Sequence, residues 1–388
     1  MAGLSIFCYN LVEMQVNIDY QPAVAQRAGI GRYTRELASH LPPYLGDDGA
    51  LSLFYFDFTR KADAPAAAER LRARPFRLAP GAIFRQLWKR GMPPRYDILA
   101  GKADVYHFCN FIIPPLAKSA KAIVSIHDMS FMRYPECAEP KNLEYLKARL
   151  GETIERADAI ITISKFSARE IAHFFPSAKG KTHVTYLGVD QSTASPGREK
   201  ILETRKRLGL ERPYILTVGT IEPRKNLPFL VDAFDMMKND EVDLVVAGRP
   251  GWNCDGILEK FKAARKADRI HHLADVADSD LPALYAGAEL YATASLYEGF
   301  GLTPLEAMLC GTPVISSCGG SLEEVLSDAA FTLRQFDLGH WALSLDGLLR
   351  DRRMRGDLKR RGFSRAQKFR WEETARQTAE IYRKVAGA

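Results

Sequence analysis

Residues 290–306 read LYATASLYEGFGLTPLE. They begin with an apolar run, Leu290–Thr293, and end in a helical pattern with Pro304 in its first turn, where proline is favoured. Between the two lies a turn with Gly299 and Gly301, whose lack of a side chain lets a ligand approach the backbone closely. A strand that passes through such a turn into a helix is typical of a parallel α/β sheet, and the free amides that open the helix form an anion site.

The same alternation of strands and helices occurs in two series. The first has helical patterns after Ile30, Pro140 and Lys165, and strands at Leu51–Phe56, Val105–Phe108, Ala122–Ile126, Ala159–Ile163 and His183–Leu187. The second has strands at Tyr214–Val218, Val242–Ala247, Arg269–Leu273, Glu289–Thr293, Pro313–Ser316 and Ala330–Leu333. A polar, turn-rich segment at 190–196 separates them. We therefore predict an α/β protein of two Rossmann-like, doubly wound domains, residues 1–190 and 198–368, which face each other across a cleft and bind ligands outside the carboxyl ends of the strands.

Two carboxylates flank the turn that opens the helix. Glu298 precedes Gly299, and Glu306 lies three residues after Thr303. Carboxylates accept hydrogen bonds from sugar and ribose hydroxyls, so both are candidates for binding a sugar nucleotide. The spacing Thr303-x-x-Glu306 also fits a capping box, in which the two side chains only close the end of the helix. The residues by themselves leave both interpretations of Glu306 open.

A second candidate segment, residues 219–226 with the sequence GTIEPRKN, follows the strand Tyr214–Val218. Its adjacent cations, Arg224 and Lys225, suit a diphosphate, because Arg can bind it with two hydrogen bonds and Lys acts as a compact charge. Such cations would stabilise a diphosphate as it departs. The alternative is a solvated charge pair. Asn226 is expected to cap the helix that follows.

The first series contributes two shorter motifs. Gly29-Ile30-Gly31 opens a helix at a glycine-rich turn, with a spacing that many turns share. Ser125-Ile126-His127-Asp128 ends an apolar strand and places a histidine where it could orient a sugar or handle a proton. The competing interpretation of His127 is a histidine at the edge of the core that is hydrogen-bonded to the backbone.

We expect no metal site and no cofactor. The six cysteines are scattered, without a C-x-x-C pair or zinc-like spacing to histidine, which is typical of reduced thiols in a cytoplasmic protein. Asp278-Ser279-Asp280 has the spacing that metal-dependent transferases use, but it precedes a helical pattern and is interpreted as an N-cap. Ser321-x-x-Glu324 is interpreted as a capping box.

The positive charge is concentrated in the first half of the chain. The net charge is +7, and ten Lys and Arg residues lie between residues 60 and 95, where Asp63 and Glu69 are the only acids. Residues 82–90, AIFRQLWKR, mix apolar, aromatic and basic side chains as helices that rest on an anionic bilayer do. The alternative is an amphipathic helix packed on its own domain. Since no run is apolar for long enough to span a bilayer, peripheral membrane contact is the expectation.

Taken together, these segments resemble family 4 (group 1) of the retaining glycosyltransferases with the GT-B fold. Most of the resemblance rests on Glu298-x7-Glu306 around Gly299-Phe300-Gly301, with Arg224-Lys225-Asn226, Gly29-Ile30-Gly31 and His127-Asp128 in the expected order. It extends over nearly the whole chain. Residues 104–115, 125–136 and 248–252 are most similar to the GDP-mannose-dependent mannosyltransferases that build bacterial surface polysaccharides.

The resemblance implies a role for each matching residue. Arg224 and Lys225 would hold the donor diphosphate, Glu298 would contact the transferred sugar, and Glu306 would bind the ribose. His127 would lie beside the reacting carbon, which completes the implied catalytic set. Further donor contacts are implied for Gly29, Gly31, Thr220, Gly248, Val276, Gly299, Phe300, Gly301 and Leu302. Relatives often have glycine at the position of Ala274, so the loop around Val276 that would hold the base is expected to differ slightly. Residues 369–388 would form a helix that crosses back onto the first, acceptor-binding domain.

The implied reaction moves a hexose, with mannose from GDP-mannose as the best match, onto a saccharide acceptor that is often lipid-linked, in O-antigen or exopolysaccharide synthesis. The anomeric configuration would be retained, the leaving phosphate would take the acceptor proton, and no metal or nucleic acid would take part. A UDP- or dTDP-hexose donor stays open, as does a sugar-nucleotide epimerase or hydrolase on the same fold.

Two other classes fit less well. A nicotinamide oxidoreductase is disfavoured because no G-x-G-x-x-G follows the first strand. A non-catalytic sugar-binding subunit is expected to lack one of the four motifs, and all four are present.

Overall fold

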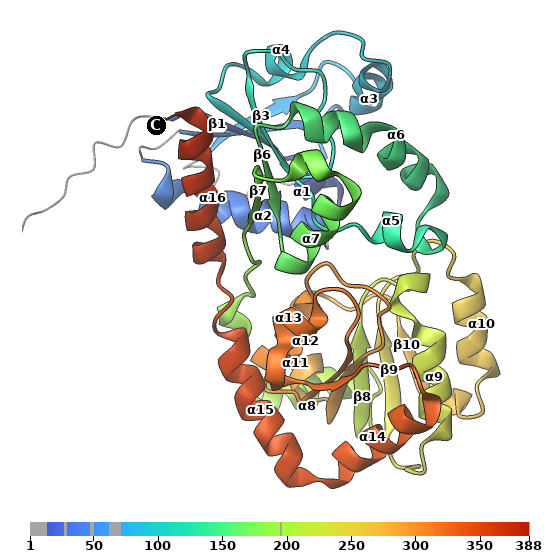
Figure 1. Ribbon diagram of the computed structural model, residues 1–388. Coiled ribbons are helices and arrows are strands. Elements are labelled where there is room, and N and C mark those ends of the chain that lie inside the picture. The colour runs from blue at the N-terminus through green and yellow to red at the C-terminus, as the bar shows by residue number, and fades with distance from the viewer. Residues whose placement is uncertain (1–13, 27–28, 47–49, 62–70, 195, 388) are drawn as a thin grey trace, which may run out of the picture.

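The computed structural model describes residues 14–26, 29–46, 50–61, 71–194 and 196–387, which form two α/β domains, one above the other in Figure 1. Each domain is built on one sheet whose strand pairings are all parallel. The predicted fold class of two Rossmann-like domains is therefore confirmed.

The first sheet has seven strands in the order β3-β2-β1-β4-β5-β6-β7. Their bounds are β1 Val16–Asp19, β2 Leu51–Phe56, β3 Arg72–Phe76, β4 Val105–Phe108, β5 Lys121–Ser125, β6 Ala159–Thr162 and β7 Thr182–Val184. The helices that accompany them are α1 Gln21–Ala25, α2 Ile30–His40, α3 Gly81–Lys89, α4 Tyr96–Ala100, α5 Ser130–Arg133, α6 Pro140–Arg156 and α7 Lys165–Phe174. Strands β4 and β6 are buried at every position, as expected of central strands covered on both faces.

The second sheet has six strands in the order β10-β9-β8-β11-β12-β13. Its strands are β8 Tyr214–Val218, β9 Asp243–Ala247, β10 Ile270–Leu273, β11 Leu290–Thr293, β12 Val314–Ser317 and β13 Phe331–Leu333. The accompanying helices are α8 Arg198–Arg207, α9 Leu227–Met236, α10 Asp255–Ala263, α11 Leu281–Ala286, α12 Leu302–Leu309, α13 Leu322–Leu326, α14 Leu338–Arg350 and α15 Arg352–Ala366. The strand order reverses between β8 and β11, as it does between β1 and β4 in the first sheet, and ligands of such sheets bind at these switch points.

Two strands of the first sheet were missed in the sequence. β1 was not predicted because the polar Asn17 interrupts its apolar run. In the structure this side chain is buried and donates a hydrogen bond to Ser52 Oγ over 2.8 Å. β3 lies at the edge of the sheet and contains Pro75 between exposed arginines, a composition that argues against an ordinary strand. An edge position tolerates both features, because one side of an edge strand needs no partner.

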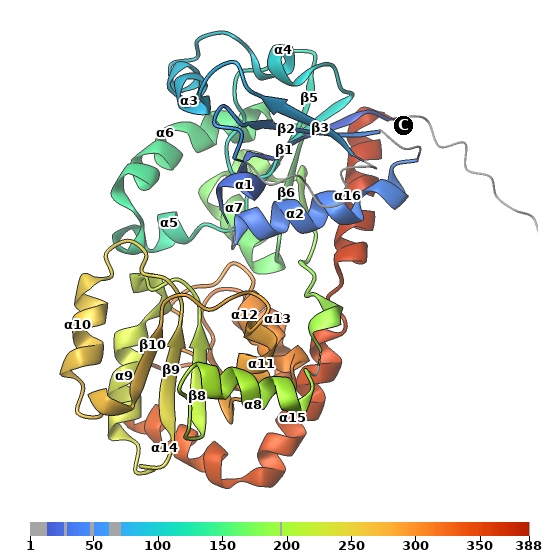
Figure 2. The ribbon, with the colours of Figure 1, turned by 180° about the vertical axis from the view of Figure 1, so that it is seen from behind.

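The last helix, α16 Trp371–Ala386, runs from the second domain back along the first (Figures 1 and 2) and packs on α2. This confirms the predicted crossing helix. Where the chain passes between domains, the stretch after β7 and the stretch before α16 lie backbone to backbone: Val189 N donates to Phe369 O over 3.1 Å, and a Cβ on Gly188 would lie 2.2 Å from Trp371 N. The domain boundaries at residues 190, 198 and 368 stay predictions.

Candidate functional site

Glu298 lies beyond the carboxyl end of β11 and is the centre of a largely buried ion cluster, in which its own side chain is 12% exposed. Lys225 Nζ and Ser295 Oγ each donate to Glu298 Oε1 over 2.7 Å, and Arg224 Nη1 donates to Oε2 over 3.0 Å. Burial alone would raise the pKa of Glu298, but Lys225 and Arg224 outweigh it and lower that pKa to about 2. The structure therefore brings together three of the four predicted catalytic side chains, all charged.

The two cations are already paired with carboxylates. Arg224 also binds the buried Glu222 through Nη2 and donates from Nη1 to the Tyr297 carbonyl oxygen over 2.7 Å. Two positive and two negative groups thus balance in this cluster. The alternative of a solvated charge pair is wrong, since the side chains of Arg224 and Lys225 are 19% and 17% exposed. An anion could bind these cations only in competition with Glu298.

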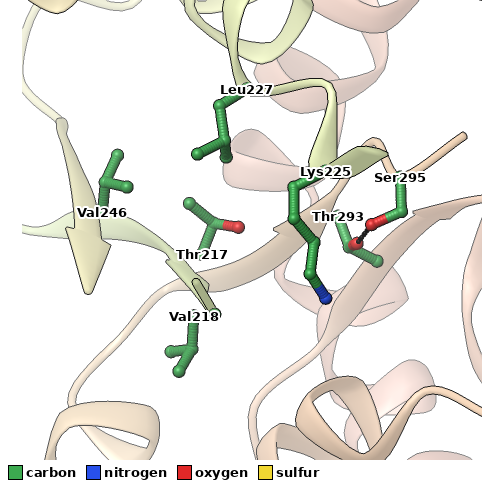
Figure 3. Close-up of a pocket in the computed structure, with 8 residues that line it drawn as sticks. Thr217, Val218, Lys225, Leu227, Val246, Thr293 and Ser295 are labelled. Carbon is green, nitrogen blue, oxygen red and sulfur yellow. Dashed lines mark hydrogen bonds between the residues drawn. The ribbon is translucent and has the colours of Figure 1, made fainter. Parts of the chain in front are cut away.

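Lys225 reaches into the switch point of the second sheet. Figure 3 shows its ammonium group between Val218, the last residue of β8, and Thr293, the last residue of β11, with Ser295 just beyond that strand. A cavity of about 10 Å³, the room of roughly one water molecule, lies at this place and is lined by Thr217, Val218, Gly219, Lys225, Leu227, Val246, Thr293 and Ser295. Asn226 occupies the N-cap position of α9 in the left-handed conformation, but its side chain makes no capping hydrogen bond, contrary to prediction.

Glycines let the loops at this end of the second sheet pack closely. A Cβ on Gly248 would lie 1.9 Å from the Gly219 carbonyl oxygen, so these two loops are in backbone contact. Thr220, next to Gly219, is exposed, and Val276 is half-buried against the main core. These predicted donor contacts therefore surround the carboxyl ends of β8, β9 and β10.

Glu306 does not cap its helix, so the capping-box interpretation is wrong. The N-cap residue of α12 is Gly301, with φ of 101° and no side-chain hydrogen bond, and Thr303 Oγ1 instead accepts from Tyr291 OH over 2.8 Å. The Glu306 carboxylate accepts from Tyr285 OH over 2.9 Å and forms an ion pair with Arg32 of the first domain. Tertiary structure overrides the local pattern here, because better donors than the helix amides lie beside the carboxylate.

The residues between the two glutamates hold the domains together. A Cβ on Gly299 would lie 2.9 Å from the Asp128 Cβ, so only glycine permits this approach of the loop to the first domain. The Phe300 ring is buried between Tyr186 and Phe369, with ring centroids 6.1 and 5.5 Å away. Leu302 is half-buried at the first position of α12. Phe300 therefore contributes a packed side chain, while the predicted ligand contact concerns its backbone amide.

His127 lies at the cleft edge of the first sheet, beyond β5. It is 6% exposed, and its Nε2 donates to the Cys109 carbonyl oxygen over 2.8 Å. Burial lowers its pKa, so the ring is neutral and Nδ1 is left as an acceptor. The backbone hydrogen bond of the structural interpretation is present, and it still leaves one ring nitrogen for a sugar hydroxyl.

In the glycine motif of the first domain, both glycines are explained by the geometry of the neighbouring backbone. Gly29 has φ of 57° and is the N-cap residue of α2. A Cβ on Gly31 would lie 1.9 Å from the Gln26 carbonyl oxygen, so Gly31 is required for packing against the end of α1. Their predicted contacts with a diphosphate stay predictions.

The carboxylate of Glu324 makes a second contact between the domains, one that the sequence did not predict. Glu324 accepts hydrogen bonds from the amides of Lys165 and Phe166, each 2.8 Å long, and so closes the amino end of α7 in the first domain. Ser321 does not form a capping box with it, since its hydroxyl donates to Phe300 O over 3.0 Å. The capping-box interpretation is therefore wrong. Glu324 does accept from helix amides, but from those of α7 in the other domain, a contact that no local pattern predicts.

In the pattern Asp278-Ser279-Asp280, the second aspartate forms ion pairs with an arginine and a lysine. Asp280 occupies the N-cap position of α11 without a capping hydrogen bond, and Arg207 Nη2 and Lys200 Nζ lie 2.7 and 3.6 Å from its Oδ1. Among the described residues, no group of three His, Cys, Asp or Glu side chains is arranged to hold a metal ion.

The comparisons with known proteins agree with this fold. Residues 27–193 match the family described as Glycosyltransferase Family 4, and residues 200–365 match Glycosyl transferases group 1. The chain is 32% identical over 286 residues to O-antigen chain mannosyltransferase B of Escherichia coli, which covers 73% of this chain and 74% of that protein. It is 31% identical over 258 residues to D-inositol 3-phosphate glycosyltransferase of Salinispora tropica, covering 61% of this chain and 53% of that protein. Sucrose-phosphate synthase from Thermosynechococcus elongatus has a similar fold, with a TM-score of 0.75 at 20% identity over 96% of this chain and 98% of that one.

The fold and these matches define a glycosyltransferase of the GT-B class. The chain belongs to the family 4, group 1 glycosyltransferases, and within them it resembles mannosyltransferases. No helix in the described ranges is long and apolar enough to cross a membrane.

Proposed function

We propose that this protein is a retaining hexosyltransferase that moves mannose from GDP-mannose to a saccharide acceptor in the synthesis of a bacterial O-antigen or exopolysaccharide. The observation that carries the proposal is the largely buried cluster of Glu298, Arg224 and Lys225 at the switch point of the second sheet, because it joins a carboxylate suited to sugar hydroxyls to two cations suited to a diphosphate. Support for mannose comes from the similarity to the O-antigen mannosyltransferase.

Each of these residues has a separate role in the proposed reaction. Arg224 and Lys225 hold the diphosphate and stabilise its charge as the bond from the anomeric carbon to the phosphate oxygen breaks. Glu298 accepts hydrogen bonds from the sugar, and His127 accepts one at Nδ1 on the opposite side of the cleft. The acceptor hydroxyl attacks from the face that the diphosphate leaves, and its proton passes to the leaving phosphate oxygen. Configuration is retained without a protein nucleophile.

The direct test is release of nucleoside diphosphate from a panel of nucleotide sugars, with a saccharide acceptor and with EDTA. Release from GDP-mannose alone, resistant to EDTA and dependent on acceptor, is the expected result. Release from a UDP- or dTDP-hexose would correct the donor. Turnover of a donor without any acceptor, giving an isomer or free sugar, would contradict transfer and favour the epimerase or hydrolase.

The ion pair between Arg32 and Glu306 has a consequence for nucleotide binding. If Glu306 binds the ribose, the nucleoside has to replace Arg32 on this carboxylate. We expect Arg32→Ala to bind the free nucleoside of the donor about twofold to fivefold more tightly, as the loss of one partly exposed ion pair allows. Glu306→Gln is expected to bind it more weakly. Calorimetric titration measures both, and equal affinity of wild type and Arg32→Ala would contradict this role of Glu306.

We propose in addition that the first domain rests on an anionic membrane, which would place the enzyme on the cytoplasmic face next to a lipid-linked acceptor. In α3, Phe84 and Trp88 point inward against Phe56, as the packed-helix interpretation expects. Two apolar side chains are nevertheless exposed here: Leu78, in the segment that precedes α3, is 85% exposed, and Ile83 on α3 is 51% exposed. The exposed Arg85 and Arg90 lie on or beside the same helix. Residues 62–70 of the basic stretch lie outside the described residues.

Flotation with vesicles that contain phosphatidylglycerol tests the membrane contact. The wild type is expected to float at low salt and less so at high salt, because screening weakens its attraction to the lipid. The double variant Leu78→Asp/Ile83→Asp is expected to stay at the bottom of the gradient. Leu343→Asp, at a site on α14 of the second domain that is 62% exposed, is the matched control and should float like the wild type. No flotation of the wild type at low salt would overturn the proposal.

A further inference from the structure

A chain of four buried polar side chains links the last helix to the cleft. Tyr382 OH of α16 lies 2.6 Å from His107 Nδ1 on β4. His107 Nε2 lies 2.8 Å from Ser125 Oγ at the end of β5, and Ser125 Oγ lies 2.9 Å from Tyr33 OH on α2. Each of the four residues is at most 1% exposed. None of them belongs to the donor site described above.

The hydrogen-bonded chain of these side chains is complete only when all four are present. Burial, aided by the proximity of His127, lowers the pKa of His107 to about 3, so its ring is neutral, with one nitrogen donating and the other accepting. Every contact in the chain therefore pairs one donor with one acceptor. Loss of the Tyr382 hydroxyl leaves a buried ring nitrogen of His107 without a partner, and the remaining contacts have to rearrange.

This hydrogen-bonded chain of side chains ends beside His127. The ring of Tyr33 meets the ring of His127 edge to face, with centroids 4.8 Å apart and planes at 82°. Tyr33 also follows Arg32 directly on α2, and Arg32 is the residue that pairs with Glu306 across the cleft. Ser125 precedes His127 by two residues. A shift of Tyr33 thus reaches both the His127 ring and the cross-domain ion pair.

We infer that the Tyr382 hydroxyl positions His127, acting through His107, Ser125 and Tyr33 at a distance from the reacting atoms. On this view α16 supports the active site in addition to covering apolar surface of the first domain. The inference rests on the proposed function for its effect on turnover, because it takes His127 to contact the transferred sugar. Its structural claim, that the His127 ring moves when the Tyr382 hydroxyl is removed, stands independently of turnover.

Tyr382→Phe tests the hydroxyl alone, with Thr378→Val as the matched control. Thr378 is on the same helix one turn earlier, is fully buried, and donates only to Thr374 O over 2.8 Å, so it lies outside the chain. Tyr382→Phe is expected to lower kcat about tenfold or more, since small misplacements near the reacting atoms cost that much, with the donor KM changed less than twofold. Thr378→Val is expected to keep the kcat of the wild type. Ser125→Ala should lower kcat as Tyr382→Phe does, and the double variant should add little, because both break the same chain.

The second measurement needs no turnover. In protein with ¹⁵N-labelled histidine, the ring signals of His127, assigned by their absence in His127→Gln, are expected to shift in Tyr382→Phe and to stay in place in Thr378→Val. Unshifted His127 signals in Tyr382→Phe would overturn the inference, as would an unchanged kcat in an active enzyme. If no donor is turned over by the wild type, the proposed function fails, while the histidine signals still decide whether Tyr382 positions His127.

Discussion

Lys225→Ala is expected to lower kcat by roughly 10²–10³-fold, the usual effect of removing one group that stabilises charge in the transition state. The Lys225 ammonium reaches the switch point between β8 and β11, where the proposed mechanism places the departing diphosphate as it gathers negative charge. The change in KM is expected to be smaller, since the charge is greatest in the transition state. Steady-state transfer with the donor found in the panel measures both constants.

The matched control for Lys225 is Lys260→Ala. Lys260 forms an ion pair with Asp232 on the surface of the same domain, and its side chain is 33% exposed. Its loss should leave kcat unchanged, because Lys260 pairs with Asp232 and not with a member of the cluster. If Lys225→Ala kept the wild-type kcat while binding nucleoside diphosphate normally, the assignment of Lys225 to the leaving group would be wrong.

Glu298→Gln is expected to separate binding of the diphosphate from transfer. The substitution keeps the shape of the side chain but removes the charge that Arg224 and Lys225 share, so Lys225 is freed for an anion and Arg224 keeps only Glu222 as a carboxylate partner. We expect the nucleoside diphosphate to bind about tenfold more tightly, which corresponds to about 1.4 kcal/mol. Transfer should fall by at least about a hundredfold, because the proposed mechanism uses this carboxylate to hold the sugar. Titration of the diphosphate and single-turnover transfer measure the two effects.

The same substitution changes stability in a manner that depends on pH. The pKa of Glu298 is lowered to about 2 in the folded protein, so its ionised form stabilises the fold above about pH 4.5, and this contribution is lost as pH falls towards 2. At pH 7, Glu298→Gln is expected to cost about 3 kcal/mol, as the loss of one partner of a buried ion pair does. The difference from the wild type should narrow below pH 4.5, which denaturant unfolding at several pH values measures.

Glu323→Gln is the control for the stability effect. Glu323 pairs with Arg334 at the surface, where both side chains are more than half exposed. Its loss should cost less than about 1 kcal/mol at any of these pH values. A Glu298→Gln protein as stable as Glu323→Gln at pH 7 would show that the buried cluster contributes little to folding.

Much of the fold could be predicted from the sequence because its signals are local. Apolar runs such as Leu51–Phe56 and Tyr214–Val218 have the bounds that the sequence predicts, since central strands of a parallel sheet are buried on both faces. The cluster of Arg224, Lys225 and Glu298 could be anticipated for a related reason: parallel strands end at one edge of a sheet, so the turns after β8 and β11 have to meet.

What the sequence by itself determined is therefore the two-domain class, most strand positions and the charged residues at the strand ends. Only the tertiary structure decided the partners that join distant parts of the chain: Arg32 with Glu306, Glu324 with the amides that open α7, and Tyr382 with His107. Each of these glutamates stood in a sequence pattern that also fits a helix cap. A polar side chain near a helix end takes the best donor within reach, and which donors are within reach depends on how the two domains pack.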